Sequence, residues 1–486
     1  MSTTQPGRAA APGPATDAES TKIDPAVWRT IWAVLVGALA VIFDTTIVSV
    51  ALHTLSTDLH ASVSTIQWVS TGYLLALAVI IPITGWAQRM LGTKRLWLIA
   101  LSIFLGGSIL SSLAWSAPSL ITFRVVQGIG GGVMLPLMST IVMQAAGGKA
   151  LGQIMSIVSL PAVLGPILGP VIGGVILTHL HWSFLFWVNV PFCVVGLVLA
   201  SIMIPKDGPV HRASFDIVGF VLLAPGLVGI LYGLSNTSGT GGFTRADVLW
   251  PLIGGVVLLL AFVLWALRRR TKALIDILLL RHWALSSSSV LLFLSGIGLY
   301  GAMLLLPLYF QQLRGMTPLD AGLLLIPQGV GTFLSRSIAG RLSDTMGARW
   351  LSVIGFAIVA VSTVPFAYAG GQTNEIWLMV ALLVRGLGLG VVTVPLMALA
   401  FRGLERPEIP DASIISRIAT QVGGAFGSAV LAVILAGALA TATTAGGAAG
   451  AFQTAFWWSV GFSAVGVVLS LMLPGKPPAV APAPEA

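Results

Sequence analysis

Long apolar runs separated by short polar stretches dominate the chain. Each run has about 20 residues or more, the length a helix needs to cross the hydrocarbon core of a bilayer. Such runs are too long for strands and lack the alternation of an outer-membrane barrel, so the pattern predicts an all-helical membrane protein. The fourteen expected spans are 28–52, 66–88, 95–115, 119–143, 151–177, 182–204, 213–235, 247–267, 283–310, 318–340, 349–369, 375–400, 411–440 and 452–473.

The two ends of the chain differ from this pattern. Residues 1–27 are polar and rich in Ala, Pro, Ser and Thr, without the apolar core of a signal peptide, and residues 474–486 are rich in Pro. We expect both ends to be disordered cytoplasmic tails. The first apolar run then serves as the insertion signal.

Composition supports a membrane protein. Of the 486 residues, 56% are hydrophobic and only 8% are charged, whereas soluble domains carry about 25% charge. This excludes a soluble enzyme and a disordered chain. Cys193 is the only cysteine, which excludes an intramolecular disulfide and a Cys-based zinc or iron–sulfur site.

The basic residues predict the orientation. If the N-terminus is cytoplasmic, 19 of the 25 Lys and Arg residues fall in cytoplasmic segments, and only Arg245 and Arg314 fall in outer loops. Both termini are therefore expected in the cytoplasm. The net charge of +9 mostly reflects topology, and its spread over short loops disfavours nucleic-acid binding. Arg336 and Arg417 lie near cytoplasmic helix ends, where their side chains can snorkel.

Two pairs of sequence stretches indicate an internal repeat. Gly85–Arg95 is similar to Gly340–Arg349, and Arg124–Gly130 is similar to Arg385–Gly390, at offsets of 255 and 261 residues. Each pair starts from the same side of the membrane, so the halves are parallel repeats, which favours a transporter over a channel or a membrane enzyme. The expected organisation is a tail at 1–27, a six-helix bundle at 28–205, a linker with two extra helices at 206–282, a six-helix bundle at 283–473 and a tail at 474–486.

Four sequence blocks in order carry a family resemblance. They are Phe43–Leu52 (FDTTIVSVAL), Gly85–Arg95, Arg124–Gly132 and Gly165–Gly174 (GPILGPVIGG). Over about residues 28–473 the chain resembles the major facilitator superfamily, and more narrowly its fourteen-helix drug:proton antiporters of the EmrB/QacA type. The resemblance implies two six-helix bundles plus two linker helices, and efflux of drugs or antibiotics in exchange for protons by alternating access.

The same blocks supply candidate gating residues. The candidates are Gly85, Arg89, Gly92, Lys94, Arg95, Gly128, Gly165, Pro166, Gly169, Pro170, Gly173, Gly174, Gly340, Asp344, Gly347, Arg349 and Arg385. The charged loop residues have an alternative role as positive-inside anchors, but Arg385 lies deeper than anchoring explains. The chain departs from the family at Arg89, where an acidic residue is usual, whereas the second half keeps Asp344.

The Gly165–Gly174 block has its own backbone logic. Gly165, Gly169 and Gly173 recur every four residues and form a small-residue stripe that permits close helix packing. Pro166 and Pro170 introduce kinks or local flexibility. In the resembled family this block lies between the two halves and marks exporters. The alternative is tight packing without movement.

Asp44 is the only acidic residue well inside an expected span, where a charge costs about 2.5–3.5 kcal/mol. At 1.5 Å per residue it lies about 22 Å from the cytoplasmic end of its helix, and Arg124 lies about 8 Å below the outer end of its own. These depths permit contact. Burial favours the protonated acid and a nearby arginine favours the carboxylate. The hypothesis is that Asp44 carries the coupled proton and Arg124 modulates it; the alternative is a static ion pair.

Polar, aromatic and Met side chains inside the spans are candidates for a substrate cavity, because such groups make adaptable surfaces. They are Thr45, Thr46, Tyr73, Gln127, Met134, Tyr300, Tyr309, Gln311 and Gln328. For each of them the alternative is core or lipid packing. Beyond Asp320 at its outer end, the tenth span contains no acidic residue, which disfavours dications and favours monocationic, neutral or zwitterionic substrates.

No enzyme signature is present. The six histidines lie at helix ends or in loops, and the sequence contains no HExxH, GxSxG or Walker A motif. We expect no enzyme activity, no metal site and no cofactor, with the proton gradient as the energy source. The expected partners are amphipathic small molecules, protons and the lipid bilayer of the cell membrane, without nucleic acid, for a monomeric chain. Three alternatives remain: an exporter of one natural product or lipid, a proton-coupled importer, and a non-transporting scaffold.

Overall fold

The protein is described by a computed structural model over residues 25–48, 51–61, 63–146, 154, 160–208, 214–237, 242–269, 273–440 and 445–474. These residues form helices and connecting turns and contain no strand, so the expected all-helical fold is confirmed. Twelve helices in this part of the chain are long and apolar enough to cross a membrane. The expected spans 151–177 and 318–340 have no counterpart among the twelve.

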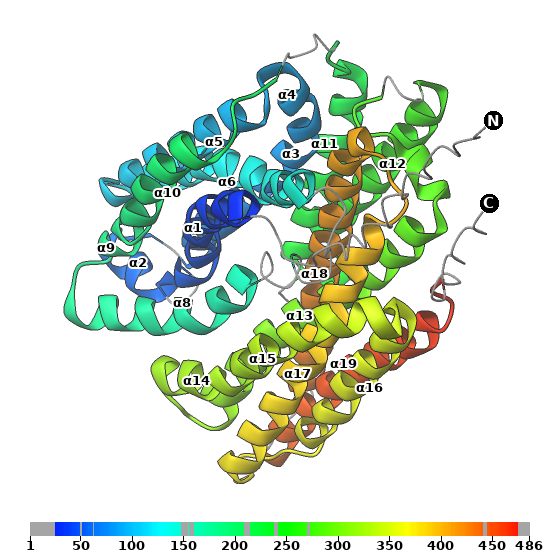
Figure 1. The fold of residues 1–486 in the computed structure, drawn as a ribbon. Helices are drawn as coiled ribbons and strands as arrows, with labels where there is room; N and C mark the ends of the chain where they lie inside the picture. Colours follow the sequence, from blue (N-terminus) through cyan, green and yellow to red (C-terminus); the bar gives the residue numbers. More distant parts are fainter. Residues whose placement is uncertain are drawn as a thin grey trace, which may run out of the picture.

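The N-terminal helices form one packed group (Figure 1). Here α1 contacts α8 and α10, while α6 contacts α3 and α5. The core helices of the group are α1 (Pro25–Ile47), α3 (Val63–Ile80), α5 (Thr93–Ser112), α6 (Ala117–Ala146), α8 (Leu160–His179) and α10 (Asn189–Met203). Its short elements are α2 (Leu52–Asp58), η2 (Ile81–Ile83), α4 (Thr84–Leu91) and α9 (Phe184–Trp187).

The C-terminal helices repeat the same pairings. Helix α13 contacts α18 and α19, as α1 contacts α8 and α10 in the first group. Helix α17 contacts α15 and α16, as α6 contacts α3 and α5. The core helices are α13 (Trp283–Leu308), α15 (Ile326–Met346), α16 (Ala348–Ala367), α17 (Glu375–Ala400), α18 (Ile409–Ala440) and α19 (Ala445–Ser470). The short elements are η5 (Ile277–Arg281), η6 (Tyr309–Leu313, a π-helix), α14 (Pro318–Leu324) and η7 (Arg406–Glu408).

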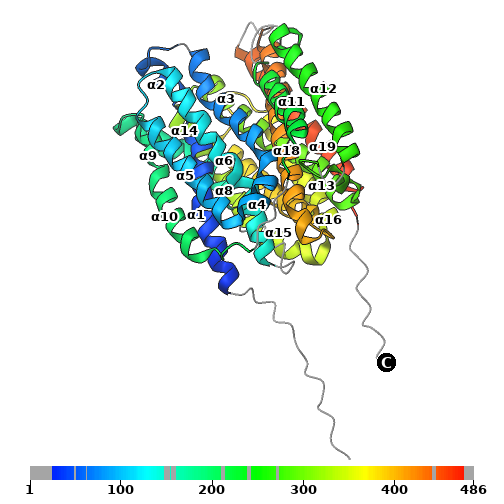
Figure 2. The same ribbon diagram turned by 90° about the horizontal axis from the view of Figure 1, so that it is seen from above.

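Two helices between the groups pack against each other at the edge of the molecule (Figure 2). They are α11 (Ile217–Ser235) and α12 (Ala246–Arg269), joined through η3 (Gly242–Thr244). Helix α11 contacts α3 of the first group and α18 of the second. Helix α12 exposes large apolar side chains such as Leu260 and Leu264, which suit contact with lipid.

Prolines explain where the helix boundaries differ from the predicted spans. The expected span 66–88 is broken at η2, which contains Pro82, and continues as α4 to Leu91. The expected span 318–340 is divided into α14 and α15, and α15 has Pro327 in its first turn. At the start of the chain, Pro25 begins α1, so the last residues of the expected tail 1–27 are helical. A proline lacks the backbone N–H and fits a first helical turn better than an interior.

Candidate functional site

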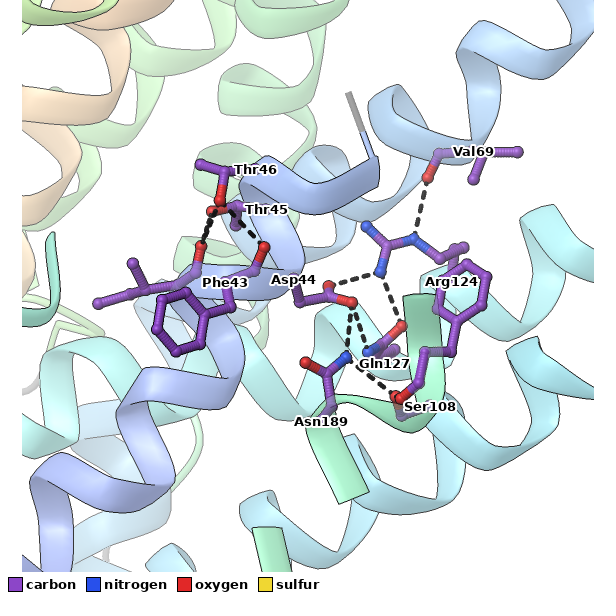
Figure 3. A network of polar contacts seen from close by, with 11 residues as sticks. Phe43, Asp44, Thr45, Thr46, Val69, Ser108, Arg124, Gln127 and Asn189 are labelled. Atoms are coloured by element: carbon purple, nitrogen blue, oxygen red, sulfur yellow. Dashed lines mark hydrogen bonds and ion pairs between the residues drawn. The ribbon is translucent and has the colours of Figure 1, made fainter. Parts of the chain in front are cut away.

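A buried ion pair joins α1 to α6 (Figure 3). Asp44 and Arg124 are each 1% exposed, and Arg124 Nη1 lies 2.5 Å from Asp44 Oδ2. The contact inferred from the two helix depths is therefore observed. A charge buried this deeply requires a partner and further hydrogen bonds, because desolvation otherwise outweighs the attraction.

Two amides complete the surroundings of the Asp44 carboxylate. Gln127 Nε2 and Asn189 Nδ2 each donate to Asp44 Oδ1 at 2.9 Å. Asn189 Nδ2 also lies 3.0 Å from Ser108 Oγ, and the Ser108 hydroxyl donates to the carbonyl of Phe186. The carboxylate thus accepts from three side chains, so it is held as part of a network across α1, α5, α6 and α10.

Asn189 and Ser108 belong to this network but were absent from the predicted site. The signal for Asn189 was its position as a polar residue in an otherwise apolar helix. Ser108 gave no signal, because serine is common in membrane helices. Their role depends on which helices are neighbours, and that information lies in the tertiary contacts of α10 with α1 and α5.

Arg124 is held on its other side by α3. Its Nε donates to the Val69 carbonyl at 3.3 Å, and its guanidinium lies 4.0 Å from the centre of the Tyr73 ring. This is cation–π geometry. Gly128 permits the approach of α6, because a side chain there would overlap the Tyr73 carbonyl. Arg124 is therefore fixed by both α1 and α3.

The Asp44 site is directly connected to α8. The Thr46 hydroxyl donates to the Gly165 carbonyl at 2.9 Å. Gly165 packs on Ile42, and a side chain at Gly169 would overlap Thr46. The glycine stripe therefore contacts α1 within one turn of Asp44. Of the other candidates in the block, Gly173 is buried and Gly174 faces Leu319 of α14, while the Pro166 and Pro170 side chains lie outside the described part.

A cavity of about 290 Å³ lies between the two groups of helices. Helices α1 and α6 line it from the first group, and α13, α15, α17 and α18 line it from the second. Four of the nine predicted cavity residues are in its wall: Thr45, Thr46, Tyr300 and Gln328. Thr45 and Thr46 follow Asp44 directly, which places the ion pair beside the cavity.

The other five predicted cavity residues lie elsewhere. Tyr73 and Gln127 belong to the Asp44 network, and Met134 is fully buried in the core. Tyr309 is buried in an aromatic cluster, and Gln311 is exposed. Polarity alone does not tell which face of a helix a residue occupies, and that face decides whether it reaches the cavity.

Two arginines expected to snorkel at helix ends line the cavity instead. Arg336 of α15 is 5% exposed, and Arg417 of α18 is partly buried. Arg336 lies ten residues from either end of α15, and Arg417 lies eight residues after the start of α18, too deep for the interfacial position that the sequence suggested. Helices α15 and α18 present the cavity with further polar groups, among them Thr332, Ser413 and Ser416.

Arg385 occupies the corresponding position in the second repeat but has neutral partners. Its Nη1 donates to Gln328 Oε1 at 2.9 Å, and its Nη2 donates to the Gly298 carbonyl at 2.7 Å. Its Nε donates to Thr363 Oγ1 at 3.2 Å. Gly298 on α13 stands where Asp44 stands on α1, at nearly the repeat offset. The two halves thus hold equivalent arginines, but among the described residues a carboxylate binds the arginine of the first half and neutral oxygens bind that of the second.

The loop block after α4 is held by backbone hydrogen bonds. Gly92 has a φ of 85°, and the Lys94 and Arg95 N–H groups donate to the carboxylate of Asp207 at 2.8 and 3.1 Å. Lys94 Nζ also donates to the carbonyls of Ser201 and Ile204. Asp207 therefore ties the end of α10 to the start of α5.

The second-half loop block has a similar turn. Gly347 has a φ of 80°, and Arg349 Nε donates to the Leu473 carbonyl at 2.6 Å. Gly340 is buried within α15. The side chain of Asp344 lies outside the described part.

Arg89 contacts the opposite group of helices. Its Nη1 lies 4.0 Å from Asp411 Oδ1 on α18. Asp411 is 8% exposed, and its Oδ2 accepts from the Asp276 N–H. Gly85 packs on Asp411, and the Ser413 hydroxyl donates to the Pro136 carbonyl of α6. The block with the unusual basic residue therefore faces an acid on the other side of the interface.

Comparisons with known proteins agree with this architecture. The family profile described as "Major Facilitator Superfamily" matches residues 34–428. A "Multidrug resistance protein B homolog" of Mycobacterium tuberculosis H37Rv is 35% identical over 84% of this chain and 76% of its own length. A "Tetracenomycin C resistance and export protein" of Streptomyces glaucescens is 30% identical over 83% of this chain and 75% of its own.

The fold is also found among solved structures. The human organic anion transporter MFSD10 (TETRAN) superposes with a TM-score of 0.64 over 92% of this chain and 100% of its own. Its sequence identity is 16%, so the likeness concerns the arrangement of helices alone.

Proposed function

The chain belongs to the major facilitator superfamily, and we propose that it is a proton-coupled antiporter that exports amphipathic drugs or antibiotics. The relatives named for multidrug resistance and for tetracenomycin resistance and export support this substrate class and direction. The cavity between the two groups of helices is the binding site of an alternating-access cycle. The protein is a multi-pass protein of the cell membrane.

The observation that carries the proposal is the buried carboxylate beside the cavity. Asp44 is enclosed by Arg124, Gln127 and Asn189, and the next two residues of α1 line the cavity. Protonation of Asp44 removes the negative partner of a fully buried guanidinium. Leaving one buried charge uncompensated costs about 3–5 kcal/mol, so a proton at this site strongly changes the relative stability of conformations.

Helix α1 carries the change to the rest of the bundle. Thr46 binds the Gly165 carbonyl on α8 and packs against Gly169. A shift of α1 at Asp44 therefore moves the surface on which α8 rests and the cavity wall formed by Thr45 and Thr46. This coupling needs no cofactor, because the proton gradient supplies the energy.

The finer architecture belongs to the same proposal. We place fourteen spans in the membrane by adding α8 and α15 to the twelve apolar helices. Both helices pack within their groups, α8 against α1 and α15 against α17. An even number of spans puts both termini on the same side of the membrane, and the distribution of Lys and Arg places that side in the cytoplasm. The six-helix bundles extend over 28–205 and 283–473, with α11 and α12 in the linker, and the transporter acts as a monomer.

Proteoliposomes with an imposed pH gradient test the proposal. The wild-type protein is expected to move fluorescent amphiphiles against their gradient, and Asp44→Asn is expected to abolish this pH-driven flux at a temperature where thermal unfolding shows the variant to be folded. Asp247→Asn is the matched control, because Asp247 is exposed at the start of α12 and pairs only with Arg245 in the described part. Full pH-driven flux in Asp44→Asn would sink the proton-carrier role.

A further inference from the structure

The charged groups of the cavity wall are all of one sign. Among the described residues, Arg336 and Arg417 are its only charged members, and no Asp or Glu lines it. The segment 147–159, whose placement is largely outside the described part, contains no Asp or Glu in its sequence either. Asp344, the next acid along α15, follows Arg336 by two helical turns, about 12 Å at 1.5 Å per residue.

Arg417 differs from Arg124 and Arg385 in making no hydrogen bond or ion pair with the described residues. Arg124 binds a carboxylate and Arg385 binds three neutral oxygens. Within the described part of the chain, the buried Nε of Arg417 has no hydrogen-bond partner, and neither has the buried hydroxyl of its neighbour Ser416. A buried donor without a partner is costly. Because both residues belong to the cavity wall, a ligand oxygen that these side chains reach by rotation would satisfy the two donors.

An anionic oxygen is the ligand that these groups fit. Guanidinium binds carboxylate through short charge-assisted hydrogen bonds, often two in parallel. Ser416 adds a hydroxyl donor on the same stretch of α18, and Arg336 adds a second positive charge across the cavity wall. A cationic group in the same place would face two arginines and no acid.

The rest of the wall is suited to an apolar body. Leu292, Leu299, Met303 and Met397 line the same cavity, together with the ring of Tyr300. Leucine and methionine side chains adapt to different apolar shapes. The cavity therefore combines one polar, positive region on α15 and α18 with an apolar region on α13 and α17.

We propose that the transported amphiphiles carry an anionic group, a carboxylate or an equivalent acidic oxygen, which Arg417 and Ser416 bind in the central cavity. The proposal rests on the proposed export function and names its substrate class. It removes monocations from the substrates that the sequence favoured, keeps zwitterions with an accessible acid, and adds organic anions.

A matched set of probes tests the charge preference. Each probe carries a pyrene on a four-carbon chain, which ends in a carboxylate, an alcohol or a trimethylammonium group. Affinities are measured by fluorescence titration of the purified full-length protein in detergent. The wild-type protein is expected to bind the carboxylate roughly tenfold or more tightly than the alcohol, with the ammonium weakest, because a charge-assisted hydrogen bond exceeds a neutral one.

Variants assign the preference to α18. Arg417→Gln is expected to bring the carboxylate-to-alcohol ratio close to one, Arg417→Lys to keep part of it, and Ser416→Ala to lower it a few-fold. Arg402→Gln is the control, because Arg402 is exposed at the end of α17 and outside the cavity wall. Thermal unfolding reports whether each variant is folded. If Arg417→Gln does not fold, the carboxylate-to-alcohol ratio of Ser416→Ala provides the test.

Two outcomes overturn the inference. One is a wild-type protein that binds the ammonium probe as tightly as the carboxylate. The other is an unchanged carboxylate-to-alcohol ratio in folded Arg417→Gln. Flux in proteoliposomes separates this inference from the export function: absence of pH-driven flux for all three probes defeats antiport, while the binding order still decides the charge preference.

Discussion

Three arginines inside the helices are held in three different ways. Arg124 neutralises the Asp44 carboxylate, Arg385 is bound by neutral oxygens from α13, α15 and α16, and Arg417 faces the cavity without a partner in the described part. The difference follows from the groups that the neighbouring helices offer. In the proposed transport cycle, Arg124 belongs to the proton site, Arg385 makes a structural contact and Arg417 contacts the ligand.

The distinct partners predict distinct stability losses at the two repeat-related arginines. Arg124→Gln leaves Asp44 buried without its cation, which costs about 3–5 kcal/mol. Arg385→Gln leaves no charge behind and is expected to cost about 1–3 kcal/mol, the loss from unsatisfied neutral partners. Thermal unfolding in detergent should therefore show a larger decrease in Tm for Arg124→Gln.

The double variant Asp44→Asn with Arg124→Gln provides the control for this prediction. Because it removes both charges, it is expected to recover part of the stability lost in Arg124→Gln. A double variant as unstable as Arg124→Gln alone would show that the stability loss comes from the missing side chain of Arg124. It would also show that the unpaired charge of Asp44 does not cause the loss.

Among the elements, α15 shows what the sequence can and cannot predict. The sequence pattern predicted a span at 318–340, but α15 is not among the twelve described helices that are long and apolar enough to cross a membrane, because it carries Thr332, Ser335, Arg336 and other polar residues. Several of these residues face the cavity. The polar residues that line the cavity are therefore also the ones that lower the apolarity of this span.

The site was predictable where one residue was exceptional. Asp44 stood out as a lone acid inside a span, and helix depth placed Arg124 near it. Asn189 and Arg417 were not predictable in the same way, because an amide in α10 or an arginine in α18 has meaning only through the helices packed beside it. Helical faces are fixed by tertiary contacts, which a single sequence does not reveal.

The contact between α4 and α18 predicts an electrostatic latch between the two groups of helices, in which Arg89 of the first group attracts Asp411 of the second. Arg89 and Asp411 face each other at 4.0 Å, with Arg89 41% exposed at its side chain. Arg89→Asp puts two carboxylates opposite each other and should favour separation of α4 from α18. Since a partly exposed pair contributes about 0.2–1 kcal/mol, the expected shift in population is roughly 1.4- to fivefold.

Spin labels at the exposed positions Leu91 and Glu405 can measure this shift as a distance distribution, in a background with Cys193 replaced by Ala. The exchange variant Arg89→Asp with Asp411→Arg restores opposite charges and is expected to bring back the wild-type distribution. Identical distributions in the wild-type protein and in Arg89→Asp would rule out the latch.

At the scale of the whole molecule, an anionic substrate makes the transport cycle sensitive to membrane potential. If one proton enters while one carboxylate leaves, two charges cross the membrane, against one charge for a neutral substrate. At about 2.3 kcal/mol per charge per 100 mV, the potential then contributes about twice as much to export of the anion. A negative cell interior favours both movements.

The charge carried per cycle can be measured in proteoliposomes with equal pH on both sides and a potassium diffusion potential. The steady-state gradient of the pyrene carboxylate is expected to change about tenfold per 30 mV, the slope for two charges, whereas one charge gives about tenfold per 59 mV. The one-charge slope would mean that the substrate crosses as the neutral acid. In that case the bound carboxylate would take up a proton before the conformational change. This result contradicts an anion held at Arg417 throughout transport.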